Sequence, residues 1–367
     1  MIFESIKELI GHLDQAFKDD DIGEPYFSDA DTTTYPLVSD GFKQIDLVES
    51  NRNIAFVDGG NQEIIGGPNF SIQLNRVCFS IWQGSEQILQ NSLQQRTSFL
   101  SATNASFSHN QINYSSTVLP IGNYHLQLPE EHDLFVSAFD ESLMFGMEMA
   151  DIHRIPSICR RFSELALANE VVKNVLKKGD VLVMDGTLHM WYPNEWKYYD
   201  PLVKSAKEKQ VTLMGISKTC GLFTTSGLSL VGALDYLSSV SNVVGAWYFP
   251  IADISRKDHS VFLMFAKFHS ASGRIFRTEI ERGQFKEMDN TEISELLAQL
   301  VNNSRDFTLP GYPYGLIDVD RFARVSTSEL PYYRQTVEAA LVDMGLWDKY
   351  NRHVKARDLH DILNSLG

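Results

Sequence analysis

The chain has 367 residues, of which 43% are hydrophobic and 22% are charged, a balance that excludes a disordered chain and is typical of a globular protein. It contains no run of the roughly 18 to 20 apolar residues that a membrane-spanning helix needs. Its first residues also lack the pattern of a secretory signal. We therefore predict a cytoplasmic protein without a membrane segment.

The charge and the cysteines restrict the kind of site to expect. The formal net charge is −15, whereas a protein that holds DNA by itself usually shows a basic surface, so any basic surface here must be local. Cys78, Cys159 and Cys220 are scattered and form no C-x-x-C pair, and no histidine stands in an H-E-x-x-H motif. The sequence therefore predicts neither disulfides nor a zinc site.

Residues 1–45 are predicted to contain a helix and an acidic connector. Apolar residues at spacings of three and four favour an amphipathic helix over residues 3–17. Residues 19–40 hold seven acidic residues and no basic one, and Gly23, Pro25 and Pro36 interrupt them. This composition is typical of an irregular connector.

The sheet is expected to begin after residue 50. Residues 54–57 form a short apolar run that ends in Asp58-Gly59-Gly60, as a strand entering a turn would. Apolar residues alternate over 70–81 with a change of phase at Asn75-Arg76. This predicts one long bent strand or two paired strands, antiparallel to the first. Residues 92–116 are dense in Ser, Asn, Gln and Thr, which favours a polar loop or insertion.

A strand–helix–strand unit follows the best helix in the chain, which is predicted over residues 158–178 with Gly179 as its cap. The unit comprises a strand over 181–184 ending in Asp185-Gly186-Thr187, a polar helix over 197–209 and a strand over 211–216. Further strands are predicted over 244–251, 261–268 and 274–280, and further helices over about 290–302 and 331–344.

These elements predict an α/β fold with a mixed sheet flanked by helices. We divide the chain into an N-terminal helix and acidic connector (1–45), a core (46–330) that includes the polar loop or insertion (92–116), and a C-terminal helical segment (331–367).

Asp58 and Asp185 are the strongest candidates for chemistry. Each follows an apolar strand and precedes a glycine. Ligands of open α/β sheets bind beyond the carboxyl ends of strands, and carboxylate oxygens are ligands for hard divalent cations. The alternative is structural, since Asp-Gly is also a favoured hairpin turn. Finding the pattern twice favours the metal site.

A metal site for two ions needs more carboxylates, and Glu164 lies on the predicted helix before the Asp185 strand. Its spacing from Arg160 is that of an ordinary i,i+4 ion pair, which spacing alone favours. Glu170 is an equally suitable candidate on the same helix.

Five segments in order resemble the motifs of the NurA family of nucleases, and together they span residues 54–325. They are 56–60 (Phe-Val-Asp-Gly-Gly), 160–164 (Arg-Arg-Phe-Ser-Glu), 183–188 (Val-Met-Asp-Gly-Thr-Leu), 215–219 (Gly-Ile-Ser-Lys-Thr) and 311–316 (Gly-Tyr-Pro-Tyr-Gly-Leu).

This resemblance implies a ribonuclease H-like fold and cleavage of DNA that depends on Mn²⁺ or Mg²⁺, with two ions. It implies a homodimer that works with a HerA-type hexameric ATPase (a translocase) in DNA end resection and double-strand break repair, as an exonuclease. Matched to the family motifs, Asp58, Glu164 and Asp185 would be metal ligands. Tyr312 would orient the phosphate or the water, and Lys218 would contact the phosphate, although a surface lysine at a strand end is the alternative.

One position departs from the family pattern. The family commonly has a histidine eight residues after the motif tyrosine, and this chain has Asp320 there. A carboxylate also binds Mg²⁺ or Mn²⁺ and favours the harder ion, so we expect Asp320 to be a metal ligand and activity to be retained. The alternative is a weak or inactive nuclease.

Two other functions remain open. An actin-like ATPase also places Asp-x-Gly at strand ends, but residues 226–320 lack the glycine-rich adenosine segment that such a protein requires. The chain could instead be an interaction subunit of a translocase complex, which its acidic charge and Asp320 favour and the retained carboxylates disfavour.

Overall fold

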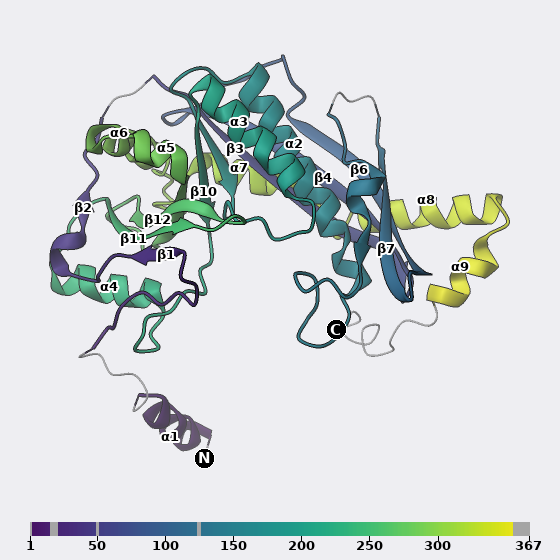
Figure 1. The fold of residues 1–367 in the computed structure, drawn as a ribbon, viewed down its shortest axis with the longest axis horizontal. Helices are drawn as coiled ribbons and strands as arrows, with labels where there is room; N and C mark the ends of the chain where they lie inside the picture. The colour runs from purple at the N-terminus through teal and green to yellow at the C-terminus, as the bar shows by residue number, and fades with distance from the viewer. Residues whose placement is uncertain (1, 15–20, 49–50, 123–125, 355–367) are drawn as a thin grey trace.

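The computed structural model of the chain describes residues 2–14, 21–48, 51–122 and 126–354, which form one large mixed sheet with helices on both faces (Figure 1). The 13 strands run in the spatial order β1-β11-β12-β13-β10-β9-β3-β4-β6-β7-β8, with β2 beside β11 and β5 beside β4. Their bounds are β1 (Thr32–Thr34), β2 (Lys43–Gln44), β3 (Ile54–Gly67), β4 (Phe70–Gln83), β5 (Glu86–Gln87), β6 (Arg96–Ser108), β7 (Gln111–Pro120), β8 (Val136–Ser137), β9 (Val181–Asp185), β10 (Thr212–Ser217), β11 (Trp247–Ser255), β12 (Ser260–Lys267) and β13 (Phe276–Glu281).

The described helices alternate with the later strands. They are α1 (Ile2–Asp14), α2 (Pro156–Asn174), α3 (Trp196–Lys209), α4 (Leu230–Val240), α5 (Arg282–Glu287), α6 (Asn290–Asn302), α7 (Tyr314–Ala323), α8 (Leu330–Asp343) and α9 (Trp347–Val354). Among the described residues, no helix combines the length and apolar character needed to cross a membrane.

The centre of the sheet is parallel and its flanks are antiparallel. β9 pairs in parallel with both β3 and β10, with Val183 opposite Phe56 on one side and Met214 on the other. α3 connects β9 to β10, so the predicted strand–helix–strand unit is confirmed. The α/β class and the ribonuclease H-like arrangement predicted from the sequence are confirmed as well.

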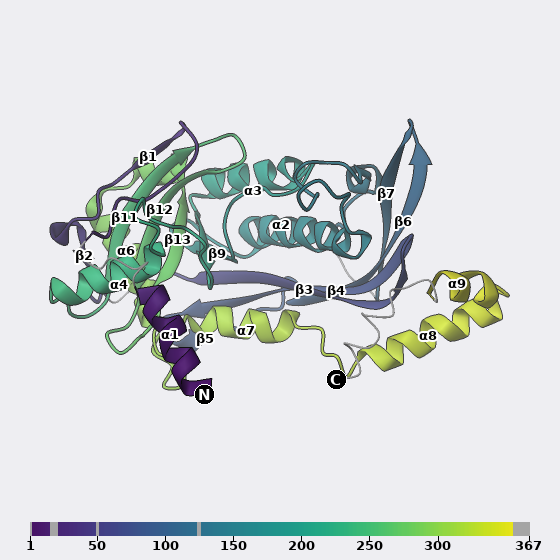
Figure 2. The same cartoon turned by 90° about the horizontal axis from the view of Figure 1, so that it is seen from below.

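Alternate residues of the central strands point into separate cores on the two faces of the sheet. Ala55 and Val57 of β3 pack in the core that also holds α2, α3 and α4, whereas Ile54 and Phe56 pack in the core that holds α6 and α7. Figure 2 shows α2 and α3 above the long strands and α7 below them. This period of two decides on which face a polar residue at a strand end will lie.

Two sequence predictions about β3 and the region after it are wrong. The strand does not turn at Asp58-Gly59-Gly60 but continues to Gly67, because β4 pairs with it antiparallel along its length. Residues 92–116 are not a loop, since β6 and β7 form a long hairpin across most of this range. The predicted single long strand over 70–81, antiparallel to the first, is confirmed by β4, and so is the change of phase: Phe70 and Leu74 pack in one cluster, whereas Val77, Phe79 and Ile81 pack in another.

Other elements differ in their limits. α2 ends at Asn174, so residues 175–178 are outside it, and Gly179 lies in a following turn with φ +86°. The sequence did not predict α4, α5, α7 or α9. The predicted acidic connector is largely irregular, as expected, apart from β1 and a short 3-10 turn, and its residues 19–20 are outside the described part of the chain.

The terminal helices lie outside the two central cores. The described part of the predicted N-terminal helix is α1, whose residues are all exposed, and residues 15–17 of that prediction lie outside the described residues. The predicted helix over 331–344 is confirmed by α8. α8 and α9 pack at the far end of the β3–β4 hairpin, against Ile64, Phe70 and Leu74 (Figure 2), and residues 355–367 are not described.

Candidate metal centre

Three polar residues on one face of the sheet lie where β9 and β10 end, beside the middle of β3. Ile54 and Phe56 point into the core beneath α7, and Asp58 continues this period of two along β3. On β9, Val181 and Val183 point into the same core, and Asp185 continues their alternation. On β10, Met214 and Ile216 point into this core, and Lys218 follows at the next position of the alternation. Because the three strands are parallel, the carboxyl ends of β9 and β10 lie together, and Asp58 directly follows the last residue of β3 that pairs with β9.

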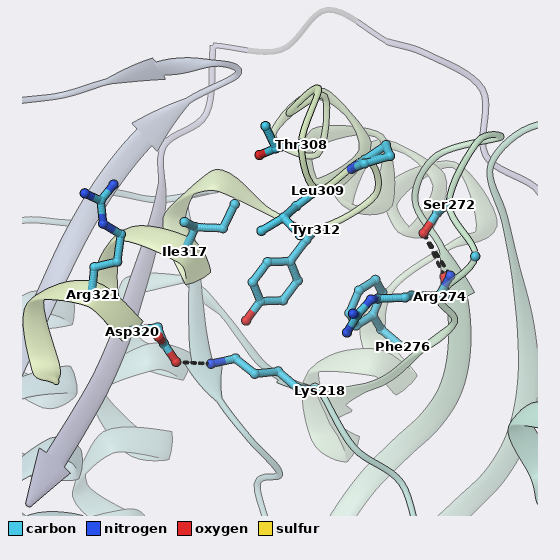
Figure 3. Close-up of a pocket in the computed structure, with 12 residues that line it drawn as sticks. Lys218, Ser272, Arg274, Phe276, Thr308, Leu309, Tyr312, Ile317, Asp320 and Arg321 are labelled. Carbon is cyan, nitrogen blue, oxygen red and sulfur yellow. Dashed lines mark hydrogen bonds and ion pairs between the residues drawn. The ribbon is translucent and has the colours of Figure 1, made fainter.

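Asp320 completes a carboxylate cluster (Asp58, Asp185 and Asp320) from α7, which covers this face. One oxygen of each carboxylate lies within 4.8 Å of the others. The ammonium of Lys218 lies 2.7 Å from Asp185 Oδ2 and 2.6 Å from Asp320 Oδ1, and Figure 3 shows it beside Asp320. Arg324 also pairs with Asp320, at 3.3 Å, so the cluster contains three acidic groups and two direct cationic partners.

The close approach of α7 to β3 depends on Gly315. A Cβ at this position would lie 1.9 Å from the ring of Phe56, so a larger residue would push the helix away from the strand. Asn303, at the end of α6, fixes the start of α7, since its Oδ1 accepts a hydrogen bond from Gly315 N at 3.1 Å and its backbone oxygen accepts one from Tyr314 N at 2.7 Å. These contacts hold Asp320 at the ends of the strands.

Two carboxylates of the cluster, those of Asp58 and Asp185, resist ionisation, whereas that of Asp320 does not. Burial first, and then repulsion by Asp185 and Glu164, raises the pKa of Asp58 to about 8, although Gly59 N donates to Asp58 Oδ1 at 2.7 Å. Burial also raises the pKa of Asp185, and the ammonium of Lys218 offsets part of that effect. In Asp320 the effect of burial is smaller than that of Lys218 and Arg324, which hold its pKa below the usual value.

Tyr312 lies beside the cluster as a neutral hydrogen-bond donor. Its hydroxyl is buried and has no hydrogen-bond partner among the described residues, and the ammonium of Lys218 lies 5.8 Å from its ring centroid. Burial and the negative charge of Asp185 raise the pKa of Tyr312 well above its usual value, so the phenol keeps its proton at neutral pH. Its hydroxyl is therefore available to a ligand.

Glu164 approaches the cluster from the opposite face of the sheet. It is buried on α2, where it forms ion pairs with Arg160 and, at 3.6 Å, with Arg161. A Cβ on Gly59 would lie 2.4 Å from Glu164 Oε1, so this glycine leaves the gap into which the carboxylate fits. The ion pair with Arg160 that the spacing favours is present, and Glu164 is not among the three grouped carboxylates.

The structure thus brings together five of the six predicted site residues, namely Asp58, Asp185, Asp320, Lys218 and Tyr312, and leaves Glu164 behind the strand. The alternative candidate, Glu170, is not part of this group. It accepts a hydrogen bond from Asn174 on the exposed side of α2. The contacts of Arg160 with β3 were not predicted: this residue donates to Gly59 O at 3.0 Å and to Asn61 Oδ1 at 3.0 Å and so links α2 to β3.

The chemistry of the donors fits a hard divalent cation. Closely spaced carboxylate oxygens with raised pKa values are stabilised when a cation binds them, and oxygen-only sites select ions such as Mg²⁺ and Mn²⁺. No cysteine or histidine belongs to this group, which disfavours a soft metal.

Comparison with known proteins gives one family for this part of the chain. A model of the NurA domain matches residues 52–325, which is most of the chain and includes every residue of the carboxylate cluster. A comparison with curated proteins gives no match.

Proposed function

This chain belongs to the NurA domain family, a family of nucleases, and we propose that it is a metal-dependent nuclease that hydrolyses phosphodiester bonds in DNA. The observation that carries the proposal is the carboxylate cluster. Its three acidic groups come from two adjacent strands and a covering helix, and they have a single direct lysine partner. A partly buried group of carboxylates of this kind is suited to bind a divalent cation from solution.

We propose that Asp58, Asp185 and Asp320 hold Mn²⁺ or Mg²⁺, with two ions in the active enzyme. Such ions, when bound, activate water and stabilise the leaving oxygen of a phosphodiester. Glu164 is proposed as a fourth carboxylate that acts through the gap above Gly59, since its charge already raises the pKa of Asp58. Arg160 serves as its counterion.

Lys218 and Tyr312 are proposed to bind the substrate phosphate. Lys218 holds its ammonium between Asp185 and Asp320, at the place where the negative charge of a phosphodiester would approach. The hydroxyl of Tyr312 keeps its proton and has no partner among the described residues, so it is suited to donate a hydrogen bond to a phosphate oxygen or to orient a water. Neither residue needs to act as a base.

The biological setting is proposed from family membership. We propose an exonuclease that works as a homodimer with a HerA-type hexameric translocase in DNA end resection in the cytoplasm. The charge of the chain supports the need for a partner, because a protein with a net charge of −15 repels DNA over most of its surface.

A second candidate is an interaction subunit of the same kind of complex that has lost catalysis. Asp320 favours this second candidate, because the family commonly has a histidine at this position. In this chain the Asp320 carboxylate forms ion pairs with Lys218 and Arg324. The retained Asp58 and Asp185 disfavour it.

The deciding experiment incubates the purified full-length protein with end-labelled single-stranded and double-stranded DNA in Mn²⁺, Mg²⁺ or EDTA. Asp58→Ala and Asp185→Ala are expected to lose at least about 100-fold in rate, since even residues that only support metal ligands are worth about 10- to 100-fold. Asp318→Asn is the matched control, because Asp318 lies on the same helix as Asp320 but accepts its hydrogen bond from Gln87.

Cleavage that requires metal and is lost in both alanine variants but not in the control supports the nuclease. If the folded wild-type protein degrades no DNA in either metal, even with the translocase present, the interaction subunit is the better description. Calorimetric titration with Mn²⁺ then shows whether the cluster still binds metal.

A further inference from the structure

The loop that follows Asp185 is anchored by a glutamate outside the carboxylate cluster. Glu195 lies directly before α3 and is fully buried. Its Oε2 accepts hydrogen bonds from Trp191 N at 2.8 Å and from Tyr192 N at 3.0 Å. Its Oε1 accepts a hydrogen bond from Arg161 Nε at 2.7 Å. Both oxygens of Glu195 therefore have partners inside the fold, and the position of its side chain is fixed.

Arg161 links Glu195 to two parts of the proposed metal centre. It lies on α2, which covers the face of the sheet opposite α7 (Figure 2), and it is buried. Its guanidinium forms an ion pair with Glu164 at 3.6 Å and donates to Thr187 O at 3.4 Å. Since Thr187 lies two residues after Asp185, one guanidinium contacts both the proposed fourth carboxylate and the turn that follows a proposed metal ligand.

The charges of this buried group on the α2 face are balanced between two arginines and two glutamates. Arg160 pairs with Glu164, whereas Arg161 lies 2.7 Å from Glu195 and 3.6 Å from Glu164. Because attraction between charges falls with distance, Glu195 is the stronger partner of Arg161. Without the charge of Glu195, both arginines would be attracted to Glu164 alone.

The charge of Glu164 matters to the carboxylate cluster because the two are close. A Cβ on Gly59 would lie 2.4 Å from Glu164 Oε1, and Gly59 directly follows Asp58. A cation bound by the cluster would therefore be attracted by Glu164 as well. A second arginine held against Glu164 would weaken this attraction.

We propose that Glu195 is a positioning residue of the metal centre. It holds Arg161 away from Glu164, so that Glu164 directs negative charge toward the cluster, and it fixes the turn after Asp185. This inference rests on the proposed function as a metal-dependent nuclease and adds a residue that controls how strongly the centre binds its cation. Glu195 itself touches neither the metal nor the substrate.

The test measures the binding of Mn²⁺ to the full-length protein by isothermal titration calorimetry, and Asp58→Ala identifies the part of the signal that comes from the cluster. Glu195→Gln removes a negative charge but keeps an oxygen that accepts hydrogen bonds from the loop. We expect this variant to bind Mn²⁺ about tenfold more weakly, since groups that support metal ligands are worth about 10- to 100-fold in affinity.

Arg161→Gln is expected to act in the opposite direction. It removes the cation that competes for Glu164, and the affinity for Mn²⁺ should rise about two- to threefold. In the double variant Arg161→Gln/Glu195→Gln the affinity should return to within about threefold of the wild type. Replacing both partners of a buried pair preserves folding better than removing one, so the double variant also serves where Glu195→Gln is unstable.

Two controls remove the same charges from a pair that is accessible to solvent on the same helix. Glu170 and Lys173 lie 4.0 Å apart on α2, and Glu170→Gln and Lys173→Gln should leave the affinity for Mn²⁺ unchanged. Thermal unfolding of each variant in EDTA measures the change in stability separately from the binding of metal.

Weaker binding of Mn²⁺ in both Arg161→Gln and Glu195→Gln, without recovery in the double variant, would overturn the proposal, because the pair would then only maintain the fold. Equal affinities in the wild type and all three variants would overturn it too. Failure of the nuclease function is a separate result, since the wild type would then bind Mn²⁺ at the cluster but cleave no DNA. A wild type that binds no Mn²⁺ would overturn the metal centre and this inference together.

Discussion

Buried carboxylates lie on both faces of the sheet, but their surroundings differ. On the α7 face, Asp58 and Asp185 lie close together, Lys218 pairs with Asp185 only, and burial with repulsion by Asp185 and Glu164 raises the pKa of Asp58 to about 8. On the α2 face, Glu279 accepts hydrogen bonds from Leu188 N and Arg277, and burial is more than offset by these groups and His259, which lower its pKa to about 2.

The difference teaches how to distinguish a structural carboxylate from a ligand. Glu195 and Glu279 on the α2 face are each matched by arginine, so their charges are neutralised within the fold. The carboxylate cluster lacks an equal number of cations, so a part of its charge must be neutralised from outside. Burial alone does not separate the two groups, whereas the count of cationic partners does.

Removing a structural carboxylate should have the largest effect on folding. Glu279→Ala leaves Arg277 and His259 in a buried position without their acceptor, and we expect a loss of about 3 to 5 kcal/mol in the free energy of unfolding. Urea denaturation measures this loss. The control Glu338→Gln breaks an exposed pair with Arg334 and should cost at most about 1 kcal/mol, and equal losses in both variants would remove the distinction.

The two kinds of carboxylate should respond to pH in opposite directions. The pKa of Asp58 rises from 3.8 unfolded to about 8 folded, so the folded state binds more protons and metal-free protein loses stability as pH rises from about 4 to 8. The pKa of Glu279 falls from 4.5 to about 2, so its contribution is present above pH 4.5 and is lost as pH falls through about 2.

Asp58→Asn removes the ionisable group and therefore the loss of stability of the metal-free protein at high pH. We expect this variant, in EDTA, to gain more than about 2 kcal/mol relative to the wild type at pH 8.5 and much less at pH 5. Thermal unfolding at both pH values measures the gain, and Mn²⁺ should raise the melting temperature of the wild type only. A gain that is equal at the two pH values would argue against a strained carboxylate at position 58.

The space beside Gly59, into which the Glu164 carboxylate fits, can be filled by adding a side chain to Gly59. A Cβ at this position would meet Glu164 Oε1 at 2.4 Å and Arg76 O at 2.9 Å, the second of which is backbone. We expect Gly59→Ala to destabilise the protein by about 1 to 3 kcal/mol and to lower cleavage by displacing Glu164. Gly84→Ala, at a position with open space and a positive φ, is the control for backbone strain without a clash.

The smallest predicted effect concerns the choice of metal. Asp320→His restores the family's usual residue, and because imidazole favours softer ions than carboxylate does, the rate in Mn²⁺ relative to Mg²⁺ should rise a few-fold. Initial rates in each metal measure the ratio. A fall in this ratio would show that Asp320 does not contact the ion.

Much of the site follows from the period of two in the central strands. Apolar residues at 54 and 56 and at 181 and 183 already indicate that Asp58 and Asp185 lie on one face, and the same spacing from 214 and 216 extends to Lys218. What the sequence could not show is the position of Glu164, because its approach to β3 depends on the missing side chain of Gly59. That contact links residues that lie more than 100 positions apart.

The missed elements have physical reasons. The β6–β7 hairpin appears polar because part of its buried face is made of hydroxyl residues, such as Thr103 and Ser116, whose oxygens lie 2.7 Å apart. Interactions of this kind leave no apolar alternation in the sequence. α7 is short and begins after Pro313, and its buried residues Leu316, Val319 and Ala323 carry the helical spacing that would have indicated it.

The order of the strands in the sheet implies that the carboxylate cluster forms late in folding. β9 occupies the place between β3 and β10, although β4, β6 and β7 all precede it in the chain. Hairpins such as β6–β7 close short loops and can form early, whereas the β3–β9 pair must close a loop of more than 100 residues. The residue that completes the cluster, Asp320, is later still. A nascent or partly folded chain therefore does not carry the assembled carboxylate cluster, and the activity that we propose would be confined to the fully folded molecule.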